Sequence, residues 1–342
     1  MFIKKVLSIL FGVLFAFFLC EIVLRIYNPF QSRVRGNEII LKSNYKRKSV
    51  IEPKINGLDP IVFYSSNSIG FRGPEPPKNW NEATTIVTIG GSTTECSLLS
   101  DDSTWPAKLY KKLGPNVPNL WLNNAGMDGC SSYGHLILMR DYIVKLKPDY
   151  AIFLVGINDL VKSSFANEDG FLINRPEAWW RKLLKKSEFI TTMSNVYEAI
   201  KSQKAKVSHG TNPYDYKNND LNVADTSVRI ATEENLKKFI PEYVTRLKSL
   251  IDICRSNNIR PILITQPKFD DVNSYSWQVM QRYNDAMIEL CKKEDVFCID
   301  LGSEMPKELS LYYDQIHYTN AGAERIAQIL SPQILNYIQN KK

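Results

Sequence analysis

Several features that would point to familiar classes of protein are missing from this chain of 342 residues. None of its six cysteines belongs to a CxxC or CxxH pair, which argues against a zinc site. No Lys/Arg run alternates with aromatic residues and the net charge is only +7, so a nucleic-acid groove is not expected. No N-x-S/T sequon occurs, which disfavours a secreted glycoprotein. We therefore expect no metal, no cofactor and no nucleic-acid partner.

One long apolar run lies at the N-terminus. Lys4 and Lys5 precede an apolar stretch that is interrupted only by Glu21, and Val6 to Tyr27 reaches the ~20 residues that a spanning helix needs. No small-x-small cleavage site follows the run. We interpret residues 1–30 as an uncleaved membrane signal anchor rather than a removed signal peptide or a buried amphipathic helix. Arginines on its other side leave the orientation undecided.

The remainder divides into a connector and a main domain. Residues 31–80 are polar and contain prolines, and they end in a turn that feeds the first strand. Residues 81–342 alternate between apolar strand patterns and helical patterns, which predicts an α/β fold with a parallel sheet covered on both faces. The predicted strands are Thr85–Ile89, Leu120–Asn123, Tyr150–Val155, Pro261–Thr265 and Val296–Asp300. The predicted helices are Trp105–Leu113, Leu136–Leu146, Leu236–Cys254, Trp277–Cys291 and Ala321–Ile338.

One interval, at about 160–233, breaks this alternation. A structureless loop of some seventy residues is improbable in a compact domain, so we expect a small lid or substrate-binding subdomain. Its Trp179-Trp180 pair is followed by basic residues and could bind a sugar or lie on a membrane surface. An ordinary amphipathic helix packed on the core fits this stretch equally well.

The first strand breaks at Gly90-Gly91 directly before Ser92, and helix-starting polar residues follow. This pattern places the Ser92 hydroxyl at the carboxyl edge of the sheet, where open α/β sheets bind ligands. Other strand ends carry NAGMDG with Gly129 and GIND with Asn158. The backbone N–H groups of Ser92 and Gly129, with the Asn158 amide, would together form an oxyanion hole.

A base for Ser92 must come from only three histidines. His135 begins a helix and His209 lies in the insert, and neither has a carboxylate at a suitable spacing. His317 has Asp314 three residues before it, in a turn that leads into the last helix. That spacing lets the carboxylate reach Nδ1 while Nε2 faces the serine. The predicted arrangement is a nucleophile, a base and an orienting acid.

The four blocks GGSTTE, NAGMDG, GIND and DQIH resemble those of the SGNH hydrolases, in the GDSL esterase/lipase superfamily, and occur in the family's order. The resemblance implies a three-layer α/β/α sandwich with a five-stranded parallel sheet, the flavodoxin-like SGNH fold. It also implies Ser92 as nucleophile, His317 as base, Asp314 as its partner, and Gly129 and Asn158 as oxyanion donors. The connector and the TWPAKL helix resemble membrane-anchored bacterial members.

The sequence departs from the family pattern at two positions. Gly91 stands where the GDS signature has aspartate, and Tyr318 stands where proline often follows the histidine. Neither change removes a catalytic group. Cys96 and Cys130 each follow an active-site block, and they could form a disulfide across adjacent strand ends or be two small buried hydrophobic residues.

These features favour a serine esterase that hydrolyses O-acyl esters, most simply O-acetyl groups, on envelope or exported carbohydrate through an acyl-enzyme. The resemblance and the anchor imply a single-pass membrane protein with an extracytoplasmic catalytic domain. An O-acyltransferase would use the same three residues, and a lysophospholipase or thioesterase would fit an apolar insert. A non-catalytic glycan-binding scaffold is the least favoured alternative, because it needs no nucleophile and base.

Overall fold

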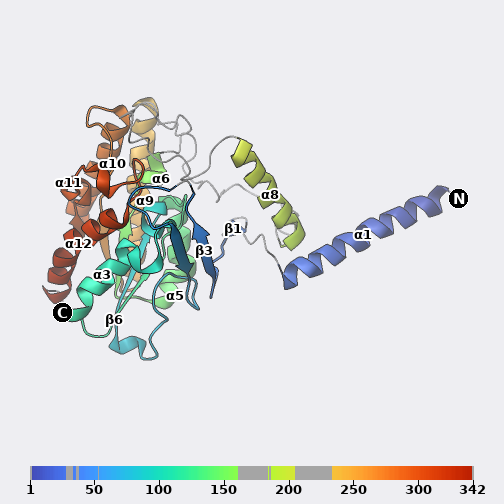
Figure 1. Ribbon diagram of the computed structural model, residues 1–342, viewed down its shortest axis with the longest axis horizontal. Helices are drawn as coiled ribbons and strands as arrows, with labels where there is room; N and C mark the ends of the chain where they lie inside the picture. Colours follow the sequence, from blue (N-terminus) through green and yellow to red (C-terminus); the bar gives the residue numbers. More distant parts are fainter. Residues whose placement is uncertain are drawn as a thin grey trace. The chain divides into compact units, whose positions relative to one another are not determined.

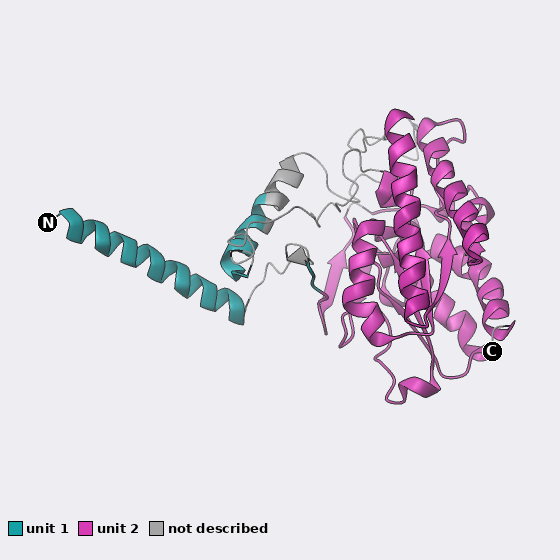
Figure 2. Ribbon diagram, turned by 180° about the vertical axis from the view of Figure 1, so that it is seen from behind, with its two compact units in different colours: residues 1–40, 172–209 teal, residues 41–171, 210–342 magenta. Residues whose placement is uncertain are grey.

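A computed structural model describes residues 2–27, 34–35, 38–52, 54–160, 184, 186–204 and 233–340. The chain divides into two compact units (Figure 2). Unit 1 comprises residues 1–40 and 172–209, and unit 2 comprises residues 41–171 and 210–342. Unit 1 thus combines the N-terminal helix with part of the segment predicted as an insert, and the boundaries at 30, 80, 160 and 233 stay predictions.

Unit 2 is built on a five-stranded parallel sheet with strand order β6-β5-β7-β8-β9. Every residue of β7 is buried and so are six of the seven residues of β5, which is why these strands are apolar along their whole length. The bounds are β5 Thr84–Gly90, β6 Leu120–Asn124, β7 Tyr150–Leu154, β8 Arg260–Ile264 and β9 Phe297–Ile299. The predicted parallel sheet is confirmed.

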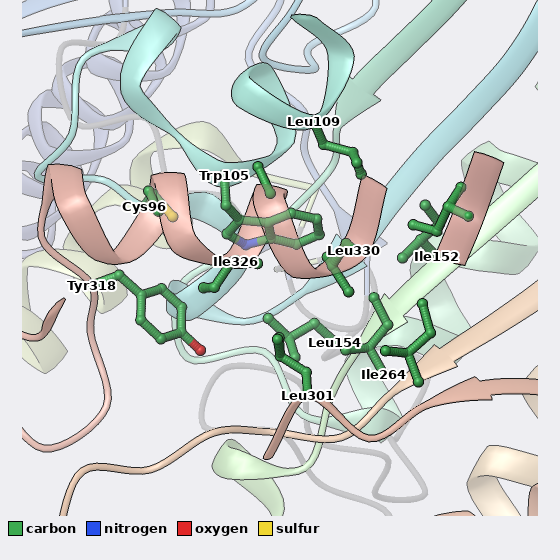
Figure 3. Close-up of a cluster of buried hydrophobic side chains, with 14 of the residues drawn as sticks. Cys96, Trp105, Leu109, Ile152, Leu154, Ile264, Leu301, Tyr318, Ile326 and Leu330 are labelled. Carbon is green, nitrogen blue, oxygen red and sulfur yellow. The ribbon is translucent and has the colours of Figure 1, made fainter. Parts of the chain in front are cut away.

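Helices cover both faces of this sheet (Figure 1). On one face, α3 (Trp105–Leu113) and α12 (Asn320–Asn340) pack together over the sheet. Figure 3 shows Trp105, Ile326 and Leu330 of this layer near Leu154 of β7. Other helices cover the opposite face: α4 (Ser132–Leu138), α9 (Glu233–Ser256) and α10 (Tyr275–Glu294). The fold is the three-layer α/β/α sandwich that the resemblance implies.

The predicted helix Leu136–Leu146 differs from the observed one. The helix begins earlier, at Ser132, and passes through a π-helical segment at Met139–Ile143 into the short helix α5 (Val144–Leu146). Lys147 then adopts a left-handed conformation, with φ 51°, and ends the helix. The earlier start brings the first residues of α4 next to the active-site loops described below.

The connector contains a β-hairpin that the sequence analysis did not predict. Strand β3 (Lys46–Val50) pairs antiparallel with β4 (Ile61–Ser65). The three consecutive basic residues that open β3 hide the alternation typical of a half-buried strand. Further along, Arg72 and Asn124 exchange two backbone hydrogen bonds of 2.9 Å, which join the connector to the end of β6.

Unit 1 pairs the N-terminal helix α1 (Phe2–Ile26) with helix α8 (Glu188–Lys204) from the insert. It also holds two short paired strands, β1 (Val34–Arg35) and β2 (Glu38–Ile39). Helix α1 is long and apolar enough to cross a membrane, and none of its residues is buried. By length and composition it is thus a candidate span.

Glu21, the acidic residue within the apolar run, links the two helices of unit 1. Its carboxylate accepts hydrogen bonds from the backbone N–H groups of Glu188 and Phe189, both at 3.0 Å, and from the Ser187 hydroxyl at 2.7 Å. Arg25 pairs with the same carboxylate at 2.8 Å. A carboxylate at a helix N-terminus satisfies amide groups that have no partner within the helix. Trp179 and Trp180 lie outside the described residues.

Three short helices follow strands of this sheet: α2 (Ser92–Glu95) follows β5, α6 (Ile157–Leu160) follows β7, and α11 (Leu301–Glu304) follows β9. Because parallel strands end at the same edge, α2, α6 and the start of α4 meet there. The functional residues lie at this edge.

Candidate active site

The serine of the first block lies at the start of a helix. β5 ends at Gly90, and α2 begins at Ser92 without an intervening loop. Ser92 is 7% exposed, so its hydroxyl is largely protected from bulk water. Since the first amides of a helix have no intrahelical acceptor, the backbone here offers donors beside the hydroxyl.

His317 and Asp314 reach this serine from the loop before α12. The Nε2 atom of His317 lies 2.8 Å from Ser92 Oγ, and its Nδ1 atom lies 2.6 Å from Asp314 Oδ2. Asp314 Oδ1 accepts the backbone N–H groups of Ile316 at 2.8 Å and His317 at 2.7 Å. The Tyr313 ring stacks on the imidazole, with 5.4 Å between ring centroids. The structure therefore brings together all three residues expected to act as nucleophile, base and acid.

The charges of this pair shift both pKa values. Burial lowers the pKa of His317, but the Asp314 charge and hydrogen bond, with a contribution from Asp128, outweigh burial and raise it above 6.5. Burial raises the pKa of Asp314, yet the His317 charge and hydrogen bonds to His317 and Ile316 bring it below 3.8. The environment thus favours an ionised carboxylate, which in turn stabilises a protonated imidazole.

The two expected oxyanion residues lie on neighbouring loops. Gly129 has φ of +70°, a left-handed conformation that glycine adopts without strain. Asn158 lies in the first turn of α6, and its Nδ2 donates to the Cys130 carbonyl at 2.9 Å. This bond fixes the amide of Asn158 against the loop that carries Gly129.

The structure also explains why glycine replaces the family's aspartate at position 91. A Cβ atom added at Gly91 would come closer than 3.0 Å to Nδ2 of Asn158, and 3.3 Å from the Cys130 carbonyl oxygen. Any side chain at position 91 would therefore displace the Asn158 amide. In this chain, the absence of a side chain at Gly91 leaves room for the Asn158 amide.

Gln266 is a site residue that the sequence analysis missed. It lies at the end of β8, and its Oε1 accepts the Thr93 hydroxyl at 3.1 Å while its Nε2 donates to the Tyr318 hydroxyl at 2.9 Å. All three side chains are buried. Since Thr93 follows Ser92 and Tyr318 follows His317, Gln266 connects the segment that carries Ser92 to the segment that carries His317. The sequence signal that could have identified Gln266 is its position as a polar residue just after an apolar strand.

A second missed network joins the loops after β6 and β7. Asp159 accepts the Ser132 hydroxyl at 2.5 Å and the Ser132 backbone N–H at 3.1 Å. Arg246 of α9 pairs with Asp159 at 3.1 Å and donates to the Ser132 hydroxyl at 2.6 Å. Asp159 is buried, and these hydrogen bonds supply the partners that a buried carboxyl group needs. The network holds the loop of Asn158 against the loop of Gly129.

Arg72 of the connector supports the helix that begins at Ser92. Its buried guanidinium donates to the carbonyl oxygens of Glu95 at 2.5 Å, Cys96 at 3.1 Å and Leu99 at 2.9 Å. It also pairs with Asp101 at 2.8 Å. These carbonyls lie at and beyond the C-terminus of α2, where a cation is favourable. The GFRG stretch of the connector thus helps to hold the helix that begins at Ser92.

Cys96 and Cys130 do not form the disulfide that was one of two alternatives. Both side chains are buried, and neither sulfur is in a disulfide. The Cys96 thiol donates to the Thr93 carbonyl at 3.3 Å, and the Cys130 thiol donates to the Ser131 carbonyl at 3.8 Å. Burial raises the pKa of Cys96 to about 12, so it is a protonated, unreactive thiol. The alternative of two small buried hydrophobic residues is the correct one.

Comparison with known proteins identifies the family. The chain matches the GDSL-like Lipase/Acylhydrolase family over residues 88–325, a stretch that contains the serine, the asparagine and the histidine described above. The chain belongs to this family. It is accordingly a carboxylic ester hydrolase of the SGNH type, and its esterase/acylhydrolase class agrees with the sequence resemblance.

No curated protein sequence matches the chain. Among solved structures, Axe2, an acetylxylan esterase from Geobacillus stearothermophilus, is 15% identical over 74% of this chain and 94% of that one, with a TM-score of 0.46. The acetyl xylan esterase AlAXEase is 15% identical over 73% and 98%, with a TM-score of 0.45. LAE5, an α/β hydrolase from the metagenome of Lake Arreo, Spain, is 18% identical over 74% and 97%, with a TM-score of 0.45. At this level of likeness these structures carry no argument about the substrate.

Within the described ranges, no three His, Cys, Asp or Glu side chains gather so as to hold a metal ion. The carboxylates near the site, Asp314 and Asp159, are each engaged with protein donors.

Proposed function

We propose that this SGNH hydrolase is a serine esterase in which Ser92 is the nucleophile, His317 the general base and Asp314 the group that orients His317. The observation that carries the proposal is the 2.8 Å distance between Ser92 Oγ and His317 Nε2. A serine hydroxyl is a weak nucleophile at neutral pH unless a base removes its proton. The Nδ1 hydrogen bond to Asp314 leaves Nε2 as the unprotonated nitrogen that faces the hydroxyl.

The reaction has two halves. Ser92 Oγ attacks the ester carbonyl as its proton moves to His317 Nε2, and the tetrahedral intermediate collapses when that proton passes to the leaving alkoxide. This step leaves an acyl-enzyme and a free alcohol. Water then attacks the acyl-enzyme with His317 again taking a proton, and the carboxylic acid leaves as Ser92 Oγ is reprotonated.

The negative oxygen of each tetrahedral intermediate needs donors. We assign this role to the backbone N–H groups of Ser92 and Gly129 and to the Asn158 side chain. An Asn amide carries two hydrogens, of which one binds the Cys130 carbonyl and one is required for the oxyanion. Such prepositioned donors stabilise the transition state more than the ground-state carbonyl.

The substrate that we propose is an O-acyl ester, in particular an O-acetyl ester, on envelope or exported carbohydrate. This assignment rests on membership of the esterase family and on the candidate membrane helix at residues 2–26. We further propose that residues 1–30 anchor the protein as a single pass and that the catalytic domain is extracytoplasmic. High salt and alkaline carbonate should leave the full chain in the membrane, and external protease should digest the domain in spheroplasts.

A fluorophosphonate probe tests the mechanism in the full chain. The wild type should be labelled at Ser92, and Ser92→Ala should not, while the exposed-serine control Ser303→Ala should label like the wild type. Failure to label the wild type, with no cleavage of activated esters, would favour the non-catalytic scaffold.

The same sample distinguishes hydrolysis from transfer. Acetylated oligosaccharide should yield free acetate at a rate unaffected by an added sugar acceptor. Acetylated acceptor that appears at the expense of free acetate would identify an O-acyltransferase. Cleavage of lysophospholipid or acyl thioester in preference to acetyl esters would instead place the substrate among lipids or thioesters.

A further inference from the structure

The β3–β4 hairpin of unit 2 has two chemically different faces. Two contacts hold it against the loop that follows α2: Arg47, on the inner face, donates to the Ser97 carbonyl at 3.2 Å, and the backbone N–H of Ser65, at the edge of β4, donates to Asp101 at 3.0 Å. Val62, on this inner face, is buried. The hairpin is thus fixed to the active-site side of the core and is not a loose appendage.

The outer face of the hairpin carries large apolar side chains in water. Val50 is 61% exposed, Phe63 is 56% exposed and Ile61 is 38% exposed. The strand register places Val50 opposite Ile61 and Lys48 opposite Phe63, so the three apolar residues form one continuous patch. Single exposed apolar residues are common, but three adjacent ones indicate a contact surface.

Two lysines flank one end of this patch. Lys46 and Lys48 are exposed on the same face as Phe63, and the Lys48 ammonium lies 5.9 Å from the centre of the Phe63 ring. Residues 42–65 contain five basic and two acidic residues. Apolar side chains flanked by lysines are typical of surfaces that lie at the boundary of an anionic bilayer. The long lysine side chains can then reach the phosphate groups.

The hairpin also follows the candidate membrane span closely along the chain. Helix α1, the candidate membrane span, ends at Ile26, and β3 begins at Lys46. At about 3.3 Å per residue the 19 residues between them span at most about 63 Å, which lets the hairpin reach the bilayer that α1 enters. It is also the first pair of strands of unit 2 along the chain.

We propose that the outer face of the β3–β4 hairpin docks onto the anionic surface of the bilayer that α1 enters. Val50, Ile61 and Phe63 would lie at the boundary between headgroups and acyl chains, and Lys46 and Lys48 would pair with lipid phosphates. This inference rests on the proposed membrane anchorage but not on the esterase mechanism. Because the inner face of the hairpin holds the loop after Ser92, docking fixes the orientation of the active site relative to the membrane.

The test uses the full chain in two kinds of vesicle. One contains phosphatidylcholine alone, and the other contains phosphatidylcholine with about 30 mol% phosphatidylglycerol, which supplies anionic lipid. An environment-sensitive fluorophore is attached at Phe63→Cys in a Cys20→Ala background, since Cys20 is exposed. The matched control carries the fluorophore at Lys293→Cys, an exposed site on α10. Labelled Cys20→Ala protein without a new cysteine gives the background.

In anionic vesicles we expect a blue shift at position 63 and strong quenching by lipid-attached nitroxides, with neither effect at position 293. Adding Lys46→Glu and Lys48→Glu should reduce the quenching at least severalfold, with esterase activity on a soluble ester unchanged. No quenching at position 63, in protein that floats with the vesicles, would overturn the proposal.

Two further outcomes would also reject it. A blue shift in detergent without lipid, accompanied by a doubled mass, would show that a second copy covers the patch. Protein that fails to float with vesicles would reject the membrane anchorage and the docking together. Labelling of Ser92 by fluorophosphonate in the same preparation reports on the esterase mechanism independently.

Discussion

Asp314 binds His317 twice, once through the imidazole and once through the backbone. Its Oδ2 lies 2.6 Å from Nδ1, and its Oδ1 accepts the backbone N–H of the same residue at 2.7 Å. The second bond forms only when the chain turns sharply between the two residues. The carboxylate therefore fixes the direction of the ring and also the loop from which the ring projects.

The first prediction concerns pH. Only neutral His317 can accept the Ser92 proton, and its pKa is raised above 6.5, so kcat/KM should rise with pH through an inflection above 6.5. Asp314→Asn removes the charge that raises this pKa, so the inflection should move to lower pH. Loss of the oriented tautomer should also lower kcat by about 10³–10⁴. The pH profiles of both proteins check this.

Asp285→Asn, an exposed carboxylate on α10, is the control for that experiment and should reproduce the wild-type profile. An unmoved inflection in Asp314→Asn would mean that a group other than His317 titrates.

The second prediction is that Ser92 and His317 act as a unit. Each single alanine variant should lower kcat by orders of magnitude. Ser92 attacks only when His317 removes its proton, and His317 acts in that step only through Ser92. The double variant should then lose scarcely more than either single variant. Steady-state kinetics on an activated ester measure the three values. Fully additive losses would show that the two residues contribute independently.

The third prediction concerns Gly91 and Asn158. Asn158→Ala removes one oxyanion donor, which typically costs about 10²–10³ in kcat, and should leave KM within a few-fold. Gly91→Ala should lower kcat in the same way without removing any donor, because its Cβ would displace the Asn158 amide. Thermal unfolding should show only a small change, since a side-chain amide can move aside.

A matched control is Gly114→Ala, at a glycine where an added Cβ meets nothing within 4 Å. If Gly91→Ala keeps full kcat, the position of the Asn158 amide is not critical. If Asn158→Ala mainly raises KM, Asn158 binds substrate rather than the oxyanion.

The fourth prediction concerns Gln266 as a positioning residue. Gln266→Met leaves the buried hydroxyls of Thr93 and Tyr318 without this partner, and an unsatisfied buried polar group costs about 1–3 kcal/mol. We expect a lower melting temperature, and a fall in kcat at nearly constant KM because Ser92 and His317 lose their common support. Gln266→Glu, which can still accept from Thr93, should restore part of kcat.

Gln281→Met, whose amide lies at the surface of α10, serves as the control and should change neither quantity. A Gln266→Met protein with wild-type kcat but reduced stability would make Gln266 purely structural.

The sequence predicts the sheet and the meeting of Ser92, Asn158 and His317 because parallel strands end at one edge. For Ser92 and Asn158 the local signal is an apolar strand that stops at glycine before a polar residue, and for His317 it is the DQIH block before the last helix; none of these signals needs knowledge of packing. Asp314 is likewise only three residues from its partner. The structure places these side chains together, and their catalytic roles are proposals that the experiments above address.

Other contacts depend on tertiary packing and could not be predicted in this way. Arg246 meets Asp159 only because α9 packs beside α4, and no spacing in the sequence encodes that pairing. The positions of Cys96 and Cys130 after neighbouring strands do not determine whether their side chains point toward each other. The pairing of β3 with β4 was hidden because its exposed face holds both lysines and apolar residues.

The nucleophile and its base stand 225 residues apart in the chain, and the base immediately precedes α12, which packs on α3. A polypeptide that lacks this last helix would still contain Ser92 and its strand but would lose one support of the loop that carries His317, a loop also held by the hydrogen bond between Gln266 and Tyr318. On the proposed mechanism, ester cleavage therefore requires the C-terminal segment to pack on α3, and C-terminally shortened chains should be inactive.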